Sequence, residues 1–356
     1  MKQYINLVNN ILKNGVEKES GRANMPNTLE ISKSSIKMDL KNGFPLLTTK
    51  KMYWKGIVHE LLWFLRGDTN IKYLVNNNVN IWNDDAYRWY NDKYVKLGAP
   101  IISFDEFIDN VKRGKKTKVN NPNPTKEHPY ERYVTYTYGD LDKVYGYQWR
   151  NQNGIDQVKD VIDGLKNNPY SRYHIINAWN KSDFNNMALP PCHLLYHFIV
   201  RPLTKKERIK YAVKELKLPK MLFETNLDLL ETNNIPKFYL DLNMYQRSCD
   251  VALGVPYNLA SMSLLLMLMA KACNMIPSVA IWIGGCTHIY LNHIENIKNQ
   301  TKRKPFELPK MKINKNLNTL EDITNLTIDD FELVNYQSHS KINFELFVGL
   351  SKDQKK

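Results

Sequence analysis

Cysteine is scarce in this 356-residue chain, which contains only Cys192, Cys249, Cys273 and Cys286. No two of them have the C-x-x-C spacing of a zinc module, and they are too few and too scattered for a disulfide scaffold. Paired zinc-ligand spacings are absent as well. We therefore predict no metal site, and we expect a reducing, cytoplasmic compartment.

The chain also lacks the motifs and apolar runs that mark several other protein classes. It has no G-x-G-x-x-G that opens a helix after a strand and no G-x-x-x-x-G-K-[ST], so neither a Rossmann site nor a P-loop is predicted. Residues 1–16 lack the apolar run and cleavage site of a signal peptide, so secretion is not expected. Residues 259–270 are the most apolar stretch, but they are roughly eight residues short of a bilayer-spanning helix. We predict a core helix there and no membrane partner.

Positive charge is in excess, with 50 Lys and Arg residues against 36 Asp and Glu residues, which gives a net charge of +14. This excess favours anionic partners without distinguishing among a nucleotide, a polyglutamate, nucleic acid and a membrane surface. The hydrophobic content of 43% is too high for a disordered chain and indicates a folded, globular protein.

Two segments differ in composition from the rest of the chain. Residues 87–138 contain the basic run at 112–118 followed by Asn-Pro-Asn-Pro, which favours an exposed loop. Residues 201–236 are rich in Lys, Glu and Leu and predict one or two surface helices. We predict one domain over residues 1–348 with these two segments as surface insertions, and a basic C-terminal extension over residues 349–356.

The remaining sequence mixes helical and strand patterns. Residues 55–65 have apolar residues on successive helical turns, and Gly67 follows at the position of a left-handed C-cap. Strands are predicted at residues 197–200, 238–244 and 279–283, the last of them ending at Gly284 and Gly285. The fold class is therefore α/β or α+β, with helices packed over a sheet.

Two side chains in apolar surroundings are candidates for chemistry. Cys192 follows two prolines, which fix the backbone before the thiol, although a packed core thiol is the commoner case for a single cysteine. Glu60 lies within the predicted helix beside a run of apolar residues. Partial desolvation would raise its pKa toward neutrality, as a general acid or base requires, unless the carboxylate faces solvent.

Two short motifs carry polar groups that suit an anionic ligand or a sugar. Residues 245–250 read YQRSCD, which places a guanidinium, a hydroxyl and a carboxylate close together, as either an anion site or a structural ion pair. In residues 284–290, GGCTHIY, an extended backbone would put His288 and Tyr290 on one face, where both can bond a sugar hydroxyl. A structural histidine is the alternative.

Five motifs together resemble the thymidylate synthase family and occur in that family's order. They are FPLLTTKK at residues 44–51, HELLWFL at 59–65, PPCH at 190–193, YQRSCD at 245–250 and THIY at 287–290. The resemblance extends from about Met1 to Val348. It implies an α+β, three-layer fold in which helices cover a large mixed β-sheet, with one sheet face at a homodimer interface.

The resemblance also implies a reaction. The Cys192 thiolate would add to C6 of deoxyuridylate (dUMP), and C5 would then attack the methylene of 5,10-methylenetetrahydrofolate. The folate would supply both the carbon and the hydride, giving thymidylate and dihydrofolate without a metal or a nicotinamide. Glu60 would move protons at the pyrimidine O4 and on the folate, and Tyr145 would lie near the C5 proton. Asn258 would bond the uracil O4 and N3–H, where an Asp would favour cytosine.

The implied site residues fall into three groups. The catalytic group is Glu60, Tyr145, Cys192, His193, Arg247 and Asp250. The nucleotide would be bound by Arg22, Arg172, Gln246, Arg247, Ser248, Asn258, His288 and Tyr290. The folate would be bound by Lys50, Ile81, Trp82, Asp250, Leu253, Gly254 and Tyr257.

Some positions depart from the family's pattern. The family exchanges two arginines between subunits at the phosphate site; Arg172 matches the first, but Tyr173 replaces the second, with His174 next to it. Residues 23–28 do not repeat the family's Thr- and Gly-rich loop, and the chain continues past Val348, where the family's C-terminus folds over the ligands. Cys286 stands where an acidic residue is common.

Two alternatives stay open at this point. A pyrimidine hydroxymethylase acting on dUMP or dCMP would use the same thiol and folate, but water would trap the exocyclic methylene instead of hydride. A nucleic-acid-binding protein with weakened catalysis is suggested by the net charge, by residues 112–118 and by the basic tail at 352–356. No RNA-recognition aromatic motif or zinc knuckle accompanies these basic runs.

Overall fold

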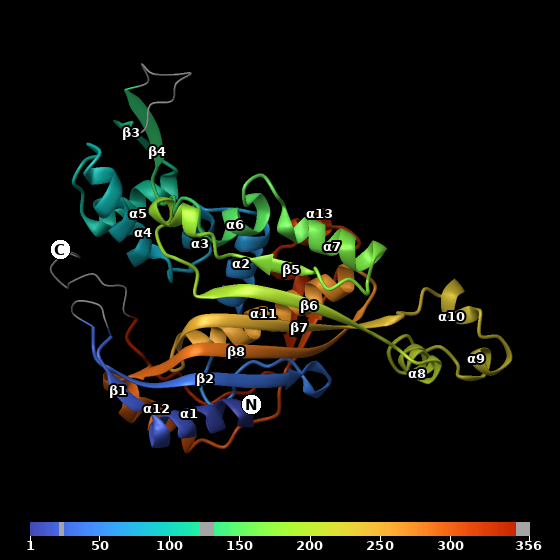
Figure 1. The fold of residues 1–356 in the computed structure, drawn as a ribbon. Coiled ribbons are helices and arrows are strands. Elements are labelled where there is room, and N and C mark those ends of the chain that lie inside the picture. Colours follow the sequence, from blue (N-terminus) through green and yellow to red (C-terminus); the bar gives the residue numbers. More distant parts are fainter. Residues whose placement is uncertain (21–24, 122–131, 347–356) are drawn as a thin grey trace.

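The computed structural model describes residues 1–20, 25–121 and 132–346 (Figure 1). The helices, short 3-10 and π segments included, are α1 (Lys2–Asn14), η1 (Leu40–Asn42), α2 (Trp54–Leu65), α3 (Lys72–Asn76), α4 (Asn83–Trp89), η2 (Tyr90–Val95), α5 (Phe104–Arg113), α6 (Tyr145–Asn151), α7 (Gln157–Asn167), η3 (Lys181–Asn186), α8 (Lys205–Glu215), α9 (Met221–Thr225), α10 (Leu229–Thr232), α11 (Gly254–Ala272), η4 (Leu291–His293), α12 (Ile294–Thr301), α13 (Leu320–Thr324) and η5 (Ile328–Asp330). The strands are β1 (Val16–Lys18), β2 (Thr28–Asp39), β3 (Lys116–Asn120), β4 (Tyr133–Thr137), β5 (Ile175–Asn177), β6 (His193–Pro202), β7 (Phe238–Asp250), β8 (Ile276–Tyr290), β9 (Lys310–Ile313) and β10 (Phe331–Val334).

A six-stranded mixed sheet organises the chain, with strand order β1-β2-β8-β7-β6-β5. β7 and β8 are parallel, while the other neighbouring pairs are antiparallel. Alternate residues of β7 and β8, such as Leu242, Met244 and Trp282, are buried on the face that α11 covers. The predicted α/β class and the mixed sheet covered by helices are confirmed.

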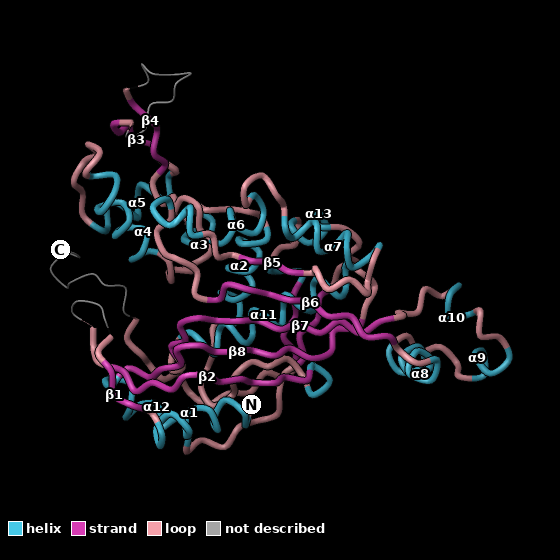
Figure 2. Tube along the Cα trace, in the orientation of Figure 1, coloured by secondary structure: helices cyan, strands magenta, loops and turns pink. Residues whose placement is uncertain are grey.

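The other face of the central strands is less covered. In Figures 1 and 2, β6, β7 and β8 lie in front of α11, and no helix of the described residues lies in front of them. The side chains on this face include the apolar Leu195, Ile199, Ile281 and Ile283, which are half-buried, and Tyr245, which is 39% exposed. An apolar sheet face without a covering layer is unusual for an isolated domain.

α2 forms where the sequence predicts a helix, and its end shows why. Gly67 has a φ of 73°, its amide donates to the carbonyl of Phe64, and the amide of Asp68 donates to the carbonyl of Trp63. These two bonds are a Schellman motif, which requires a residue in the left-handed region and so favours glycine. The helix therefore ends at Leu65, shortly after Glu60.

α11 contains the apolar stretch that the sequence assigns to the core. It is long and apolar enough to meet a membrane-span criterion by length and composition, but 72% of its apolar window is buried inside the protein. Its residues Leu264, Leu265 and Leu268 are fully buried against the rest of the core. The prediction of a core helix is confirmed.

β8 corrects one sequence-based prediction. The strand does not end at Gly284 and Gly285 but continues to Tyr290. A Cβ at Gly284 would lie 2.4 Å from the Trp282 side chain, so the glycine is needed for packing inside the strand and not to end it. Because the backbone stays extended, His288 and Tyr290 do point to the same face.

The described residues of 87–121 and 132–138 form helices and strands instead of the predicted exposed loop. The basic run at 112–118 spans the end of α5 and the start of β3, and its Lys and Arg side chains are exposed. Tyr90, Phe107 and Tyr138 belong to the main hydrophobic core. Much of the segment is therefore part of the core, because its aromatic residues supply buried surface. Three residues of the Asn-Pro-Asn-Pro run lie outside the described residues.

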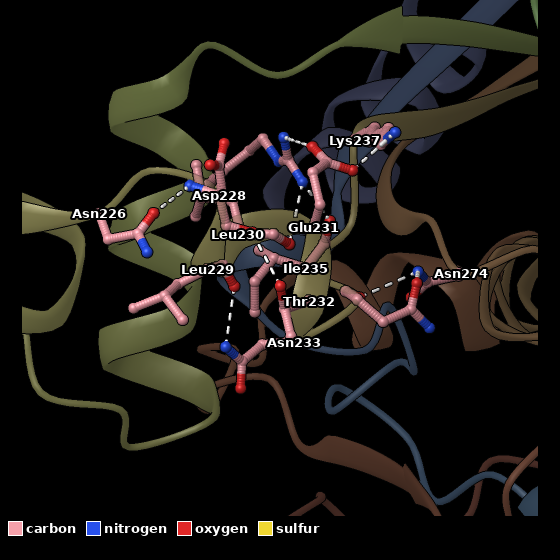
Figure 3. A network of polar contacts seen from close by, with 12 residues as sticks. Asn226, Asp228, Leu229, Leu230, Glu231, Thr232, Asn233, Ile235, Lys237 and Asn274 are labelled. Carbon is pink, nitrogen blue, oxygen red and sulfur yellow. Dashed lines mark hydrogen bonds and ion pairs between the residues drawn. The ribbon is translucent and has the colours of Figure 1, made fainter.

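Residues 201–236 form a helical module between β6 and β7. It contains three helices, α8, α9 and α10, where one or two were predicted. Its own small core consists of Ala212, Phe223, Leu230 and Ile235. Figure 3 shows how Glu231 ties the module together, because one carboxylate oxygen accepts from Arg208 at 2.7 Å and the other from Lys237 at 2.7 Å.

Candidate active site

The polar residues of the site continue the core face of the sheet past its apolar part. Gln246, Ser248 and Asp250 follow Met244 at every second position of β7, and β8 carries Cys286, His288 and Tyr290 in the same way. Register places Ser248 beside Cys286 and Asp250 beside His288. Because β7 and β8 are parallel, both strands bring their carboxyl ends to one edge, where these side chains gather.

Two adjoining cavities lie at this edge of the sheet. The first has a volume of about 340 Å³ and is lined by the predicted residues Trp82, Tyr145, Cys192, His193, Gln246, Ser248, Asp250, Leu253, Gly254, Asn258, His288 and Tyr290. The second has a volume of about 470 Å³ and is lined by the predicted residues Lys50, Glu60, Ile81, Trp82, Leu253, Gly254, Tyr257 and Asn258. Trp82, Leu253, Gly254 and Asn258 border both, so two ligands bound here would touch each other.

Cys192 contacts a phenol through its backbone amide and a guanidinium through its sulfur. The Cys192 amide donates to the Tyr145 hydroxyl oxygen at 2.7 Å, and the Arg247 Nη2 lies 3.8 Å from the Cys192 sulfur. Arg247 also donates to the carbonyls of Pro190 and Pro191 at 2.8 and 2.7 Å. The two prolines before the thiol therefore orient the guanidinium, which stabilises a thiolate by Coulomb attraction.

Half-buried His193 and buried Tyr145 form an aromatic pair next to the thiol. Their rings stack at 4.4 Å between centroids with an interplanar angle of 20°, and His193 Nδ1 lies 2.6 Å from the Tyr196 hydroxyl. Burial lowers the pKa of His193 to about 4 and raises the pKa of Tyr145 well above its usual value. Both groups are neutral at neutral pH, so they can bond a substrate without adding charge.

Glu60 projects from α2 into the second cavity and meets the indole of Trp82. The Trp82 Nε1 donates to a Glu60 carboxylate oxygen at 2.8 Å. Burial raises the pKa of Glu60 to about 7, although this hydrogen bond favours the charged form and partly opposes the shift. A carboxyl group that titrates near neutral pH can both accept and donate a proton under working conditions.

A chain of amide hydrogen bonds fixes the orientation of Asn258. The Trp282 Nε1 donates to the Gln246 Oε1 at 2.8 Å, and the Gln246 Nε2 donates to the Asn258 Oδ1 at 3.1 Å. Since an indole N–H can only donate, it determines which end of the Gln246 amide is the oxygen, and Gln246 then determines the same for Asn258. The Asn258 amide nitrogen remains available as a donor, and its oxygen keeps a second lone pair.

Asp250 lines the first cavity and Lys50 lines the second. The Asp250 Oδ1 accepts from the amides of Ala252 and Leu253 at 3.0 and 3.1 Å, which orders the turn before α11. Lys50 is 3% exposed, and its Nζ donates to the Ala252 carbonyl at 2.7 Å and lies 4.6 Å from the centre of the Phe344 ring. Burial lowers the pKa of Lys50 to about 8, opposed by the charge of Asp250.

Some predicted residues are not brought into the cavities. Arg172 is exposed and lines neither of them, and Tyr173 beside it is 89% exposed. His174 is only 2% exposed and packs against Gly164, so its imidazole does not lie on the surface beside Arg172. Arg22 and the residues after 346 lie outside the described residues.

Several lining residues were not found from the sequence. Asp85 and Leu189 border both cavities, and Lys18, Glu30 and Cys286 line the first. Asp85 stands in an Asn-Asp-Asp run after Trp82, which gave no signal of its own. Glu30 would have been found by pairing residues 28–39 with residues 279–290, which lie about 250 positions apart. In the described part of the chain, no group of three or more His, Cys, Asp and Glu side chains could hold a metal ion.

Comparisons with known proteins agree with this geometry. Residues 2–348 match the family described as Thymidylate synthase. The thymidylate synthase of Mesoplasma florum is 40% identical over 350 residues, and that of Malacoplasma penetrans is 38% identical over 351 residues; each match covers 98% of this chain and 100% of the relative. The thymidylate synthase of Mycoplasma pneumoniae is 37% identical with the same coverage. The chain belongs to the thymidylate synthase family.

Proposed function

We propose that this protein is a methyltransferase that converts dUMP to thymidylate with 5,10-methylenetetrahydrofolate as carbon donor and reductant. The observation that carries the proposal is the position of the Cys192 sulfur, 3.8 Å from the Arg247 guanidinium, in a cavity that adjoins the one containing Glu60. A nucleophile in one cavity and a proton-transfer group in the next suit a reaction between two ligands in contact.

The first chemical step uses the residues around the thiol. The Cys192 thiolate attacks C6 of the pyrimidine, and the electron pair of the C5–C6 double bond moves into the C4 carbonyl. Arg247 stabilises the thiolate before attack. The enolate formed at O4 needs a hydrogen-bond donor, which the Asn258 amide nitrogen supplies, because its oxygen is turned toward Gln246.

The later steps use groups from both the first and the second cavity. C5 bonds to the folate methylene, its proton is removed near Tyr145, and the C–N bond to the folate breaks to leave an exocyclic methylene. Hydride from the reduced pterin converts this methylene to methyl, and the Cys192 sulfur leaves C6. Glu60, with a pKa of about 7, exchanges protons with the pyrimidine O4 and the pterin.

The second cavity fits the folate by shape and by its polar groups. Trp82 offers an aromatic surface at the junction, where a pterin can pack against the pyrimidine. Asp250 lines the first cavity next to Leu253 and Gly254, which border both, and from there it can accept from the pterin. Leu253, Gly254 and Tyr257 line the wall of the second cavity. Lys50 supplies positive charge near the turn before α11, which suits an anionic ligand.

The proposal is tested by supplying both substrates and following dihydrofolate spectrophotometrically, with the nucleotide product identified by mass. We expect thymidylate and dihydrofolate in equal amounts. Production of 5-hydroxymethyl-deoxyuridylate without dihydrofolate would instead assign the protein to the hydroxymethylases. Salt-sensitive RNA binding without turnover would favour the nucleic-acid alternative.

We also propose a homodimer in which Arg172 serves the partner's nucleotide site. The half-buried apolar face formed by Leu195, Ile199, Tyr245, Ile281 and Ile283 provides an isologous surface. Arg172 is exposed and outside its own chain's cavities, which supports a role in another subunit. All four cysteines lie in the described residues and none forms a disulfide, which supports a reducing, cytoplasmic location.

Subunit complementation tests this arrangement. We expect the Arg172→Ala and Cys192→Ala proteins to be inactive or weak alone, and to regain about a quarter of wild-type activity after unfolding and refolding together. Half of the dimers in such a mixture are hybrids, and each hybrid has one site with both intact residues. Refolding Cys192→Ala with the double variant Arg172→Ala/Cys192→Ala is the matched control and stays inactive. A mixture without recovery, or a monomer in sedimentation at micromolar concentration, contradicts the shared site.

A further inference from the structure

Three neighbouring strands place a row of polar side chains on the floor of the first cavity. Register pairs Glu30 of β2 with His288 of β8, and Lys18 of β1 with Thr28 two positions from Glu30. Cys286 lies two positions from His288 on β8. Because alternate residues share a face, Lys18, Glu30, Cys286 and His288 all point into the cavity, and all four line it.

These side chains contact one another in sequence. Lys18 Nζ lies 3.2 Å from a Glu30 carboxylate oxygen. Burial and the neighbouring Glu30 carboxylate, which can accept from the thiol, raise the pKa of Cys286 to about 11. The Cys286 sulfur lies 3.7 Å from His288 Nδ1, and the Cys286 carbonyl oxygen lies 3.3 Å from the same nitrogen. The Glu30 side chain is 18% exposed while that of Lys18 is 62% exposed, so the carboxylate is the partly shielded member of the ion pair.

We propose that Glu30 is a positioning residue that acts through Cys286 on the imidazole of His288, and that it supports the hydrogen bond between His288 and the ribose 3′-hydroxyl of the nucleotide. This inference rests on the proposed nucleotide site. It also accounts for Cys286 at a position where the family often has an acid, because the neighbouring strand supplies the carboxylate instead.

Glu30 acts on His288 through the tautomer of the imidazole, that is, through which of its two ring nitrogens carries the proton. An ionised carboxylate only accepts, so the Cys286 thiol must donate to Glu30, and its sulfur then offers only lone pairs to His288. The Cys286 carbonyl is an acceptor as well, so both neighbours of Nδ1 favour a proton on that nitrogen. Nε2 is then left as an acceptor, which suits the proton of a ribose hydroxyl.

The Glu30→Gln substitution changes the hydrogen bonding to the Cys286 thiol with little change in side-chain size. A glutamine amide can donate to the sulfur, which frees the thiol proton to turn toward His288 Nδ1. The imidazole would then carry its proton on Nε2 and would lose its acceptor for the hydroxyl. The loss should concern the 3′-hydroxyl and not the base or the phosphate.

The test compares the dissociation constants of dUMP and of 2′,3′-dideoxyuridylate, which lacks the hydroxyl, by titration calorimetry. For Glu30→Gln we expect binding of dUMP to weaken 5- to 10-fold and binding of the dideoxy nucleotide to stay within twofold. Cys286→Ala removes the thiol but keeps the backbone carbonyl that accepts from Nδ1, so its binding of dUMP should weaken less than that of Glu30→Gln. The double variant Glu30→Gln/Cys286→Asp restores a carboxylate beside His288 and should recover dUMP binding.

Glu17→Gln is the matched control, because Glu17 lies on β1, is exposed and does not line the cavity. It should bind both nucleotides as the wild type does. An equal loss for both nucleotides in Glu30→Gln, or no loss in that variant, overturns the inference. Turnover of dUMP by the wild type is measured separately, so a failure of the proposed function is distinguishable from a failure of this inference.

Discussion

Replacement of Cys192 by alanine should reduce kcat/KM for thymidylate formation by roughly 10⁴-fold or more, which corresponds to about 5 kcal/mol of lost transition-state stabilisation. The loss should be this large because C5 of the pyrimidine becomes a nucleophile only after C6 is attacked. The other thiol of the first cavity, Cys286, has a pKa that burial and the Glu30 carboxylate raise to about 11, so it is a poor substitute for Cys192. Dihydrofolate formation under saturating substrates measures the effect. A covalent adduct with 5-fluoro-deoxyuridylate, detected by mass, should also disappear.

Cys273→Ala is the matched control for this substitution. Cys273 is half-buried at the end of α11, and its sulfur lies 3.9 Å from the carbonyl oxygen of Ile162, far along the chain from the site. Turnover should remain close to that of the wild type. If Cys192→Ala kept more than about 1% of the activity while the control behaved as expected, covalent catalysis by this thiol would be refuted.

Glu60→Gln should lower kcat by about 10²- to 10⁴-fold and remove the titration near pH 7 from the kcat profile. The pKa of Glu60 is raised to about 7 by burial, so its carboxyl group changes protonation within the working range. Glutamine keeps the shape and can still contact the Trp82 indole, but it does not exchange protons. The pH profile of kcat between pH 5.5 and 9 tests the assignment.

The same raised pKa predicts an effect on stability with a defined sign. In the unfolded chain a glutamate ionises near pH 4.5, while folded Glu60 holds its proton to about pH 7. The favourable contribution of the protonated form is complete below pH 4.5 and is lost as the pH rises through 7, by about 3 kcal/mol in total. The wild type should therefore lose stability relative to Glu60→Gln over this window, measured by urea unfolding. An unchanged difference across the window would show that Glu60 is not buried as described.

The elements that sequence predicts best are those with a strong local cause. α2 has apolar residues on every turn and ends at a glycine with positive φ, so both its pattern and its end are encoded within residues 54–67. β8 is different, because Gly284 resembles a strand end locally and is explained only by the Trp282 indole that packs against it. Local patterns cannot show such a contact.

The site residues divide in the same way, into those with a local sequence signal and those placed by contacts between distant residues. Cys192 and Arg247 stand in motifs that resemble a known family, so their proximity is predictable from the amino-acid sequence. Glu30 and Asp85 have no such motif, and they reach the cavity only through strand register or helix packing. The prediction of an exposed loop at 87–138 is wrong because the basic run and prolines are conspicuous, whereas the burial of Tyr90 and Tyr138 depends on contacts between distant residues.

The helical module between β6 and β7 should unfold locally at a lower free energy than the main core. β7 has 13 residues, so the module lies roughly 40 Å from the end of the strand that carries Asp250. Its core of four buried residues is too small to match the stability of the main core. Amide hydrogens in α8, α9 and α10 should therefore exchange through local opening, with a lower free energy than those of α11. Substitutions in the module can therefore lower its own stability without lowering the stability of the sheet edge that carries the site.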